Sequence, residues 1–232
     1  MGRPLHYSAE LPGRCQALID RYSDEIARDR ELANRFGGPL MTTFLLAMAT
    51  PMLVLPLERL FKPATGRAPG VADDVELDPA LAGRVAGNLA GAQRFRDAPF
   101  FGDGGWHYVP SCDTFNVGGR WPDDCLNLLA AEEAGLAAEQ ALVGDILWAL
   151  RHSLAHGGVT YLDGDGRHDQ LATNMLGFAS FVNDSKRTRL RLLRVGVGDF
   201  RNFLCRWANW LTKSGTAEAL SALGPGYFRA AE

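Results

Sequence analysis

The most reactive side chains of this 232-residue chain lie together in one short segment. Arg151, His152 and His156 fall within six residues, and Gly157 and Gly158 follow directly. An arginine guanidinium is always charged and matches the oxygens of a phosphate, and a histidine can accept or donate a proton near neutral pH. These residue types at this spacing favour chemistry at a phosphate group, with a histidine as acid or base and the arginine as anion ligand.

The segment is predicted to end a long helix that spans residues 122–156. Asp123 or Asp124 is suited to cap the start of this helix, and Gly157 and Gly158 are suited to end it. Apolar side chains recur at helical spacing and predict one buried stripe, formed by Leu129, Leu136, Val143, Leu147, Leu150 and Leu154.

An ideal helix separates the arginine from the last histidine. His152 and His156 share one face, and Asp145 falls between their directions two turns earlier. Arg151 points about 140° away from His156, because successive helical residues are rotated by about 100°. The two can therefore act together only if the last turn unwinds at the glycines, or if a second subunit contributes its own helix.

The string LWALRHSLAHG, residues 147–157, resembles the RNase motif of the HEPN superfamily, in which an arginine, a polar residue and a histidine end a long helix before a glycine. It is close to the form LRNxxAHG. The segment PLMTTFLLAMATPMLVLPLERL, residues 39–60, is similar to one in HEPN-type proteins as well. The resemblance covers residues 14–212.

The resemblance implies a mainly α, HEPN-like helical bundle, often a homodimer, that cleaves RNA without a metal ion or other cofactor. Arg151 would stabilise charge on the scissile phosphate, and His156 would act as general base on the ribose 2′-OH. His152 stands where many members have asparagine, so it would orient the phosphate or act as a second acid or base. The expected protein is a cytoplasmic endoribonuclease, a toxin or defence component with an antitoxin as a possible partner.

The same residues also permit other roles. A HEPN-type fold can bind RNA, a nucleotide or a protein partner without cleaving anything, and this is the alternative function. In a structural role, His156 would bind carbonyls at the helix end, and Arg151 would pair with Asp145 or Glu139. A metal site built from His152, His156 and Asp145 is a further alternative, since histidines four residues apart can share an ion.

The four cysteines offer a second, weaker metal candidate. None forms a CxxC pair, although Cys112 and Cys125 flank a loop that contains Asp113 and Asp123 and lies near His107. Structural zinc sites usually supply their ligands in closely spaced pairs, so free thiols in a reducing cytosol are the better interpretation. The N-terminus lacks the apolar core of a signal peptide, which also favours the cytoplasm.

A basic segment follows the motif, in a chain whose formal net charge is −3. If residues 187–191 form a strand, three arginines share one face, and the candidate RNA-binding residues are Lys186, Arg187, Arg189 and Arg191. Such a stripe would follow an RNA backbone through its phosphates. The alternative is an ordinary solvated sheet face.

The expected helices before the motif are an amphipathic one over residues 14–36, a strongly apolar one over about 40–60, and a short one over 79–95. Residues 40–57 carry no charge, and their length is at the lower limit for a membrane span. Two prolines and three threonines in this run favour a helix buried on all sides in a bundle instead.

The remaining segments complete a single expected domain, with residues 14–156 as its helical core. Residues 97–124, rich in glycine and aromatic residues, are expected to be a covering or functional loop packed on the protein. Three short segments, 159–162, 176–182 and 188–195, predict an antiparallel β-meander within residues 157–197. Asp199 is expected to cap a final helix, 200–212, in the region 198–212, and residues 213–232 form a loose tail.

Overall fold

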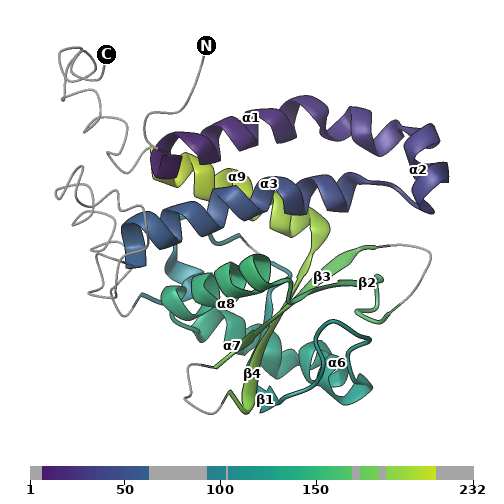
Figure 1. The fold of residues 1–232 in the computed structure, drawn as a ribbon. Coiled ribbons are helices and arrows are strands. Elements are labelled where there is room, and N and C mark those ends of the chain that lie inside the picture. Colours follow the sequence, from purple (N-terminus) through teal and green to yellow (C-terminus); the bar gives the residue numbers. More distant parts are fainter. Residues whose placement is uncertain (1–6, 63–92, 103, 169–172, 183–186, 213–232) are drawn as a thin grey trace, which may run out of the picture.

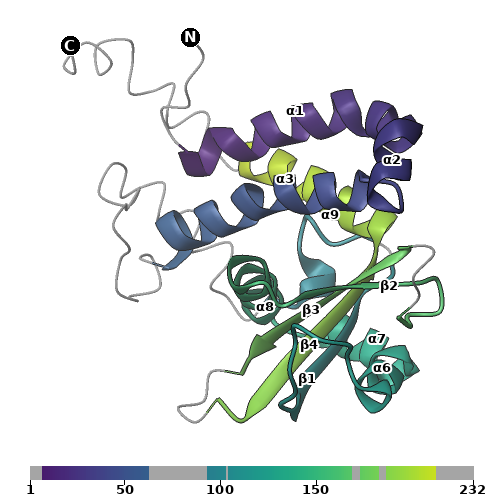
Figure 2. The same ribbon diagram turned by 45° about the vertical axis from the view of Figure 1, so that its right-hand side comes forward.

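The fold is mainly helical and contains one four-stranded antiparallel sheet (Figure 1). A layer of helices lies above the sheet, and helix α8 (Val143–His156) and helices α6–α7 (residues 123–140) cover its opposite faces (Figure 2). Because both faces are covered, the strands contribute to two separate apolar cores. The computed structural model describes residues 7–62, 93–102, 104–168, 173–182 and 187–212.

The first expected helix is two helices. Helix α1 spans Tyr7–Arg28 and α2 spans Arg30–Phe36. The break falls at Asp29, whose extended backbone allows its carboxylate to accept a hydrogen bond from Leu32 N at 2.9 Å. A side-chain cap of this kind competes with helix continuation, which explains why the prediction of one helix over 14–36 was wrong.

The apolar helix α3 spans Met41–Pro56 and continues into a short π-helical turn, η1, over Leu57–Phe61. It packs against α1, α8 and the last helix, α9 (Val197–Leu211). Thr43 and Ala47 are exposed, so the expected burial on all sides was wrong. Within the described residues, one helical stretch, Met41–Phe61, is long and apolar enough to span a membrane, and 44% of its most apolar window is buried inside the protein.

The predicted β-meander is confirmed and gains a fourth strand. Strands β2 (Val159–Leu162), β3 (Met175–Phe181) and β4 (Arg189–Gly196) follow the predicted segments closely. Strand β1 (His107–Asp113) pairs with β4, and the order is β1-β4-β3-β2. It lies within the predicted loop 97–124. An irregularity in the pairing between Val109 and Cys112 interrupts the alternation that would have marked it as a strand.

The predicted long helix is three helices: α6 (Asp123–Ala130), α7 (Glu132–Gln140) and α8 (Val143–His156). Extended backbone at Ala131 and Leu142 separates them. The second break lies where residues 93–95 cross the chain, because Val143 N donates to Gln93 O at 3.0 Å and Phe95 N donates to Ala141 O at 2.8 Å. Leu136, predicted for the buried stripe, is consequently 56% exposed on α7.

The aromatic residues of the predicted loop do pack onto the protein, as expected. Around the 3-10 turn η2 (Phe95–Asp97), aromatic rings meet rings of α9 mostly edge to face: Phe95, Phe100, Trp106, Phe203 and Trp207. Helix α9 begins directly after Gly196, so Asp199 lies in its first turn and does not cap it. The predicted helix 79–95 and the tail 213–232 lie wholly or mostly outside the described residues.

Candidate functional site

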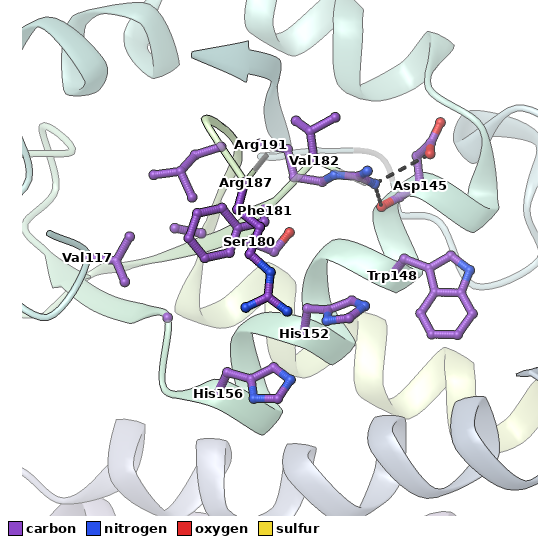
Figure 3. A pocket seen from close by; sticks show the side chains of 13 residues that line it. Val117, Asp145, Trp148, His152, His156, Ser180, Phe181, Val182, Arg187 and Arg191 are labelled. Atoms are coloured by element: carbon purple, nitrogen blue, oxygen red, sulfur yellow. Dashed lines mark hydrogen bonds and ion pairs between the residues drawn. The ribbon is translucent and has the colours of Figure 1, made fainter. Parts of the chain in front are cut away.

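The described residues enclose a pocket of about 580 Å³ between the outer face of α8 and strands β3 and β4 (Figure 3). Its polar lining consists of Asp145, His152, His156, Ser180, Arg187 and Arg191. Its apolar lining includes Val117, Trp148, Phe181, Val182 and Leu190. The size suits a small ligand or one segment of a larger one, and the mixture of cations and aromatic rings suits an anion attached to a flat group.

Helix α8 directs both motif histidines into this pocket. The rings of His152 and His156 are 5.8 Å apart between centroids and lie 26° from parallel, and Asp145 lines the same wall. The predicted shared face is therefore confirmed. Helix α8 stays regular to His156 and ends at Gly157, whose left-handed φ of 72° lets its N–H donate to Ser153 O. The last turn of α8 does not unwind. Within this chain, unwinding therefore does not bring Arg151 and His156 together, and of the two predicted arrangements the one with a second subunit is left.

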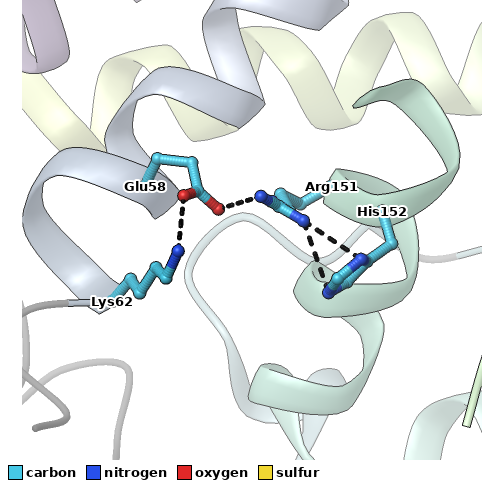
Figure 4. Close-up of polar contacts among 4 residues, drawn as sticks. All are labelled: Glu58, Lys62, Arg151 and His152. Atoms are coloured by element: carbon cyan, nitrogen blue, oxygen red, sulfur yellow. Dashed lines mark hydrogen bonds and ion pairs between the residues drawn. The ribbon is translucent and has the colours of Figure 1, made fainter. Parts of the chain in front are cut away.

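Arg151 lies outside the pocket lining. Its guanidinium forms an ion pair with Glu58 of η1, and Glu58 also accepts from Lys62 Nζ at 3.0 Å (Figure 4). The side chains of Arg151 and Glu58 are only 14% and 22% exposed. The predicted surface pairing with Asp145 or Glu139 was therefore wrong. The motif arginine instead contacts the neighbouring His152, with Arg151 Nη1 3.0 Å from Nδ1.

The basic segment divides between different places. Arg187 and Arg191 line the pocket, and Arg191 Nη1 lies 3.4 Å from the Asp145 carboxylate. Arg189 donates instead to Asp113 Oδ1 at 2.6 Å. Lys186 lies outside the described residues. The predicted continuous stripe of arginines is thus reduced to two positions at the pocket, because a cross-strand carboxylate on β1 binds the third.

Two buried polar atoms in the pocket lining have no hydrogen-bond partner among the described residues. These are Ser180 Oγ and Arg191 Nε. Buried polar groups in proteins are nearly always paired, and a donor without a partner is costly unless a ligand or water meets it. Both atoms are closed to solvent, so a bound molecule would reach them only if these side chains moved.

Burial and the local charges together keep His152 neutral. Burial, followed by the charges of Arg151, His156 and Arg191, lowers the pKa of His152 to about 4, against the opposing effect of Glu58. Three nearby cationic or potentially cationic groups and one carboxylate thus surround a partly buried ring. At neutral pH His152 can donate or accept a hydrogen bond, but it carries no charge.

This lowered pKa makes a prediction about stability. Between pH 6.5 and 4 the unfolded chain binds a proton at His152 that the folded chain does not, so stability is full above pH 6.5 and falls as the pH drops toward 4. Replacing His152 with glutamine should reduce this acid-dependent loss of unfolding free energy by on the order of 1–2 kcal/mol. The figure takes into account that the ring is partly exposed.

Urea denaturation of wild type and variant at pH 7.5 and 4.5 measures this difference. A double difference is needed because the pKa values of His107 and His168 are also lowered, chiefly by burial, and both add to the acid sensitivity. An identical pH dependence in the two proteins would contradict the assignment of His152 as a neutral buried base.

Two hydrogen bonds anchor the end of α8 and the glycine segment after it to β3. Ser153 Oγ donates to Ala179 O at 2.8 Å, and Ala179 N donates to Gly158 O at 2.7 Å. Ser153 is fully buried, and Gly158 leaves no room for a side chain against Ala179 O. Small residues at these positions therefore set the distance between the histidines and the strand that forms the opposite wall.

The metal alternatives receive little geometric support. Across the described ranges, no three His, Cys, Asp or Glu side chains come together as a metal ion requires. Cys112 and Cys125 lie close enough to interact, and burial, followed by the neighbouring Cys125, raises the pKa of Cys112 to about 12. Such a thiol stays protonated, which disfavours both metal binding and nucleophilic attack.

Several residues that form the site were not predicted from the sequence. Trp148, Ser180 and Phe181 line the pocket, and Glu58 binds the motif arginine. Glu58 carried one usable signal, since it is the first charge after the uncharged run 40–57. The other three resemble ordinary core or strand residues. Comparison of the chain with protein-family models, curated proteins and solved structures finds no match.

Proposed function

We propose that the pocket binds a phosphodiester group of RNA and that the protein is a metal-independent endoribonuclease of the HEPN type. The observation that supports this most is the convergence of two histidines, one helical turn apart, with two arginines in a single pocket. Arginines supply phosphate ligands, and histidine supplies proton transfer near neutral pH. A cytoplasmic location, a homodimer and a toxin or defence role with an antitoxin belong to the same proposal.

In the proposed reaction Arg187 and Arg191 hold the phosphate, and His156 at the exposed end of α8 acts as general base. His156 accepts the proton of the ribose 2′-OH as the 2′ oxygen bonds to phosphorus. The bond from phosphorus to the 5′ oxygen breaks, and that oxygen takes a proton from solvent. The products are a 2′,3′-cyclic phosphate and a 5′-hydroxyl. Arg187 and Arg191 thus take the part that the resemblance assigns to Arg151.

One observation favours the second candidate, an RNA- or nucleotide-binding module or protein-interaction module without catalysis. Arg151 is held by Glu58 instead of lining the pocket. If the motif arginine must touch the scissile phosphate directly, a single chain retains the binding groups and lacks part of the catalytic set. The pocket would then bind a phosphate-containing ligand and leave it intact.

RNA cleavage in the presence of EDTA distinguishes the two candidates. Unstructured and structured RNAs are incubated with the protein, together with a matched strand that carries 2′-deoxyribose at the cleaved position. Cleavage of RNA alone, with cyclic phosphate ends, supports the nuclease. Binding of the same RNAs without cleavage supports the binding module, and the absence of both overturns the proposal that the pocket takes RNA.

The two pocket arginines should control RNA binding. Replacing Arg187 or Arg191 with glutamine should weaken binding and lower the salt slope of the affinity by about 1 for each phosphate that the variant no longer binds. Arg189→Gln is the matched control, because Arg189 lies on the same strand as Arg191 but pairs with Asp113 outside the pocket. Binding curves measured between low and moderate salt give the slopes. An equal loss of affinity in all three variants would indicate a diffuse charge effect instead of a pocket.

A further inference from the structure

The pocket is larger than a phosphate group requires. Its volume of about 580 Å³ is in the range of cavities that enclose whole small molecules, so a phosphate bound by Arg187 and Arg191 leaves most of it unfilled. Much of the remaining lining is apolar and consists of Val117, Phe181, Val182 and Leu190. In Figure 3, Val117 and Phe181 lie on one side of the two histidines, and Trp148 lies on the other. The rest of the pocket is therefore suited to a flat or apolar group attached to the phosphate.

Phe181 presents an exposed aromatic ring to this part of the pocket. It is the last residue of β3 and is 49% exposed, whereas Phe178, three residues earlier on the same strand, is fully buried. Phe181 belongs to neither of the two apolar cores that the described residues form. Removing an apolar ring face from water is favourable, and a second flat group can do so by stacking on it. Phe181 is thus available to a ligand in a way that the core aromatic residues are not.

The ring of Phe181 lies beside a candidate phosphate ligand. The guanidinium of Arg187 is 5.9 Å from the centre of the ring, and both residues are exposed, so a ligand can reach them without a rearrangement of the core. In a nucleotide, one ribose joins the phosphate to the base, so these two groups lie close together. Nucleobases stack on aromatic rings and on guanidinium planes alike. The juxtaposition of Arg187 and Phe181 therefore favours a nucleobase as the flat group.

We propose that Phe181 is the stacking platform for an unpaired nucleobase, next to the phosphate that Arg187 and Arg191 bind. This base subsite rests on the proposed function, and it requires that the nucleotide in the pocket is not base-paired. A paired base is stacked between its neighbours in a double helix and offers no free face to Phe181. Stacking by itself sets no sequence preference, since every base has a face that can stack.

Replacing Phe181 with leucine tests the subsite, because leucine keeps an apolar side chain and removes the ring. The variant should bind single-stranded RNA roughly 5- to 150-fold more weakly, which is the contribution of one base stacked on an aromatic ring. The salt slope of the affinity should stay at the wild-type value, because the arginines still bind the phosphate. Phe181→Trp should bind at least as tightly as wild type. The measurements use 2′-fluoro RNA, which cannot be cleaved because it has no 2′-OH.

Phe36→Leu is the matched control. Phe36 is 60% exposed, and the guanidinium of Arg35 lies 5.3 Å from the centre of its ring, so this pair also combines an exposed phenylalanine with an arginine. Phe36 lies on α2 and does not line the pocket. Its replacement should leave RNA binding unchanged. Equal losses of affinity in Phe36→Leu and Phe181→Leu would overturn the subsite, since any exposed ring would then have the same effect.

Removing the base instead of the ring gives the complementary test. Trinucleotides that lack one base but keep its sugar and phosphate are compared with the intact trinucleotide, and their short length limits shifts of register. Wild type should lose affinity when the stacked base is missing, and Phe181→Leu should lose little more, because the two changes remove the same contact. Losses that add fully at every position would contradict the subsite. A longer duplex that binds wild type as tightly as its single strand would contradict it as well.

Binding outcomes also separate the base subsite from the proposed function. If wild type binds no RNA, both fail. If RNA binding depends on Arg187 and Arg191 while Phe181→Leu binds as tightly as wild type, the base subsite alone is wrong. None of these measurements needs cleavage, so a protein that binds RNA without cleaving it can still support the subsite.

Discussion

Replacing His156 with alanine should lower the rate of RNA cleavage by roughly 10²–10⁴, the usual contribution of a general base. His156 is exposed at the end of α8 and lines the pocket, so its removal takes away the proposed base and little packing. Initial rates on one RNA at saturating concentration, in EDTA, measure the loss of activity. The circular dichroism spectrum and the midpoint of urea denaturation should remain close to wild type.

His156→Asn separates catalysis from helix capping. Asparagine can still hydrogen-bond the last carbonyls of α8, but it cannot accept a proton near neutral pH, so this variant should be as inactive as His156→Ala. Arg151→Ala should reduce cleavage as well, through the misplacement of His152. If wild type, His156→Ala and Arg151→Ala cleave at the same rate, both residues are excluded from the mechanism.

The largest expected effect on stability comes from Gly158→Ala, at about 3 kcal/mol. A Cβ built at this position would lie 2.2 Å from Ala179 O, a backbone atom in the middle of β3 that cannot move without disturbing the sheet. The hydrogen bond from Ala179 N to Gly158 O holds the two segments at that distance. The denaturant dependence of unfolding gives the change in free energy, provided that the slope is unchanged.

Gly157→Ala is the matched control. Nothing lies within 4 Å of its added Cβ, but its φ of 72° is left-handed, which costs an L-residue about 1 kcal/mol. Comparison of the two variants thus separates the free-energy cost of a steric clash, at Gly158, from that of a left-handed backbone conformation, at Gly157. Equal destabilisation in both variants would show that contact with β3 does not determine the effect. Because Gly158 lines the pocket, its variant should also weaken RNA binding.

Local patterns in the sequence predicted local structure well. The alternation and turn residues after the motif predicted β2, β3 and β4 to within about two residues, and four-residue spacing predicted that His152 and His156 share a face with Asp145. Each of these depends on residues close together in the chain, so no distant contact is needed to produce it.

Long-range contacts overruled the pattern elsewhere. The apolar stripe from 129 to 154 fits one helix, but the crossing segment 93–95 breaks it before α8, and α7 turns aside to pack on β1. The breaks at Ala131 and Leu142 occur although the alanines around them favour helix, because tertiary contacts outweigh helix propensity. Strand β1 likewise forms through its pairing with β4, although the alternation of apolar and polar residues along β1 is irregular.

Residue spacing is enough to predict that two histidines and an arginine end a helix, and that the arginine points away from the last histidine, because directions on a helix depend only on spacing. The partner of each side chain depends on how the helices and strands pack. Burial of its guanidinium required a carboxylate for Arg151, and Glu58 from a distant turn supplies it. Spacing along α8 supplies the pocket with histidines but with no arginine. The fold of the sheet places Arg191 of β4, and Arg187 just before β4, beside these histidines.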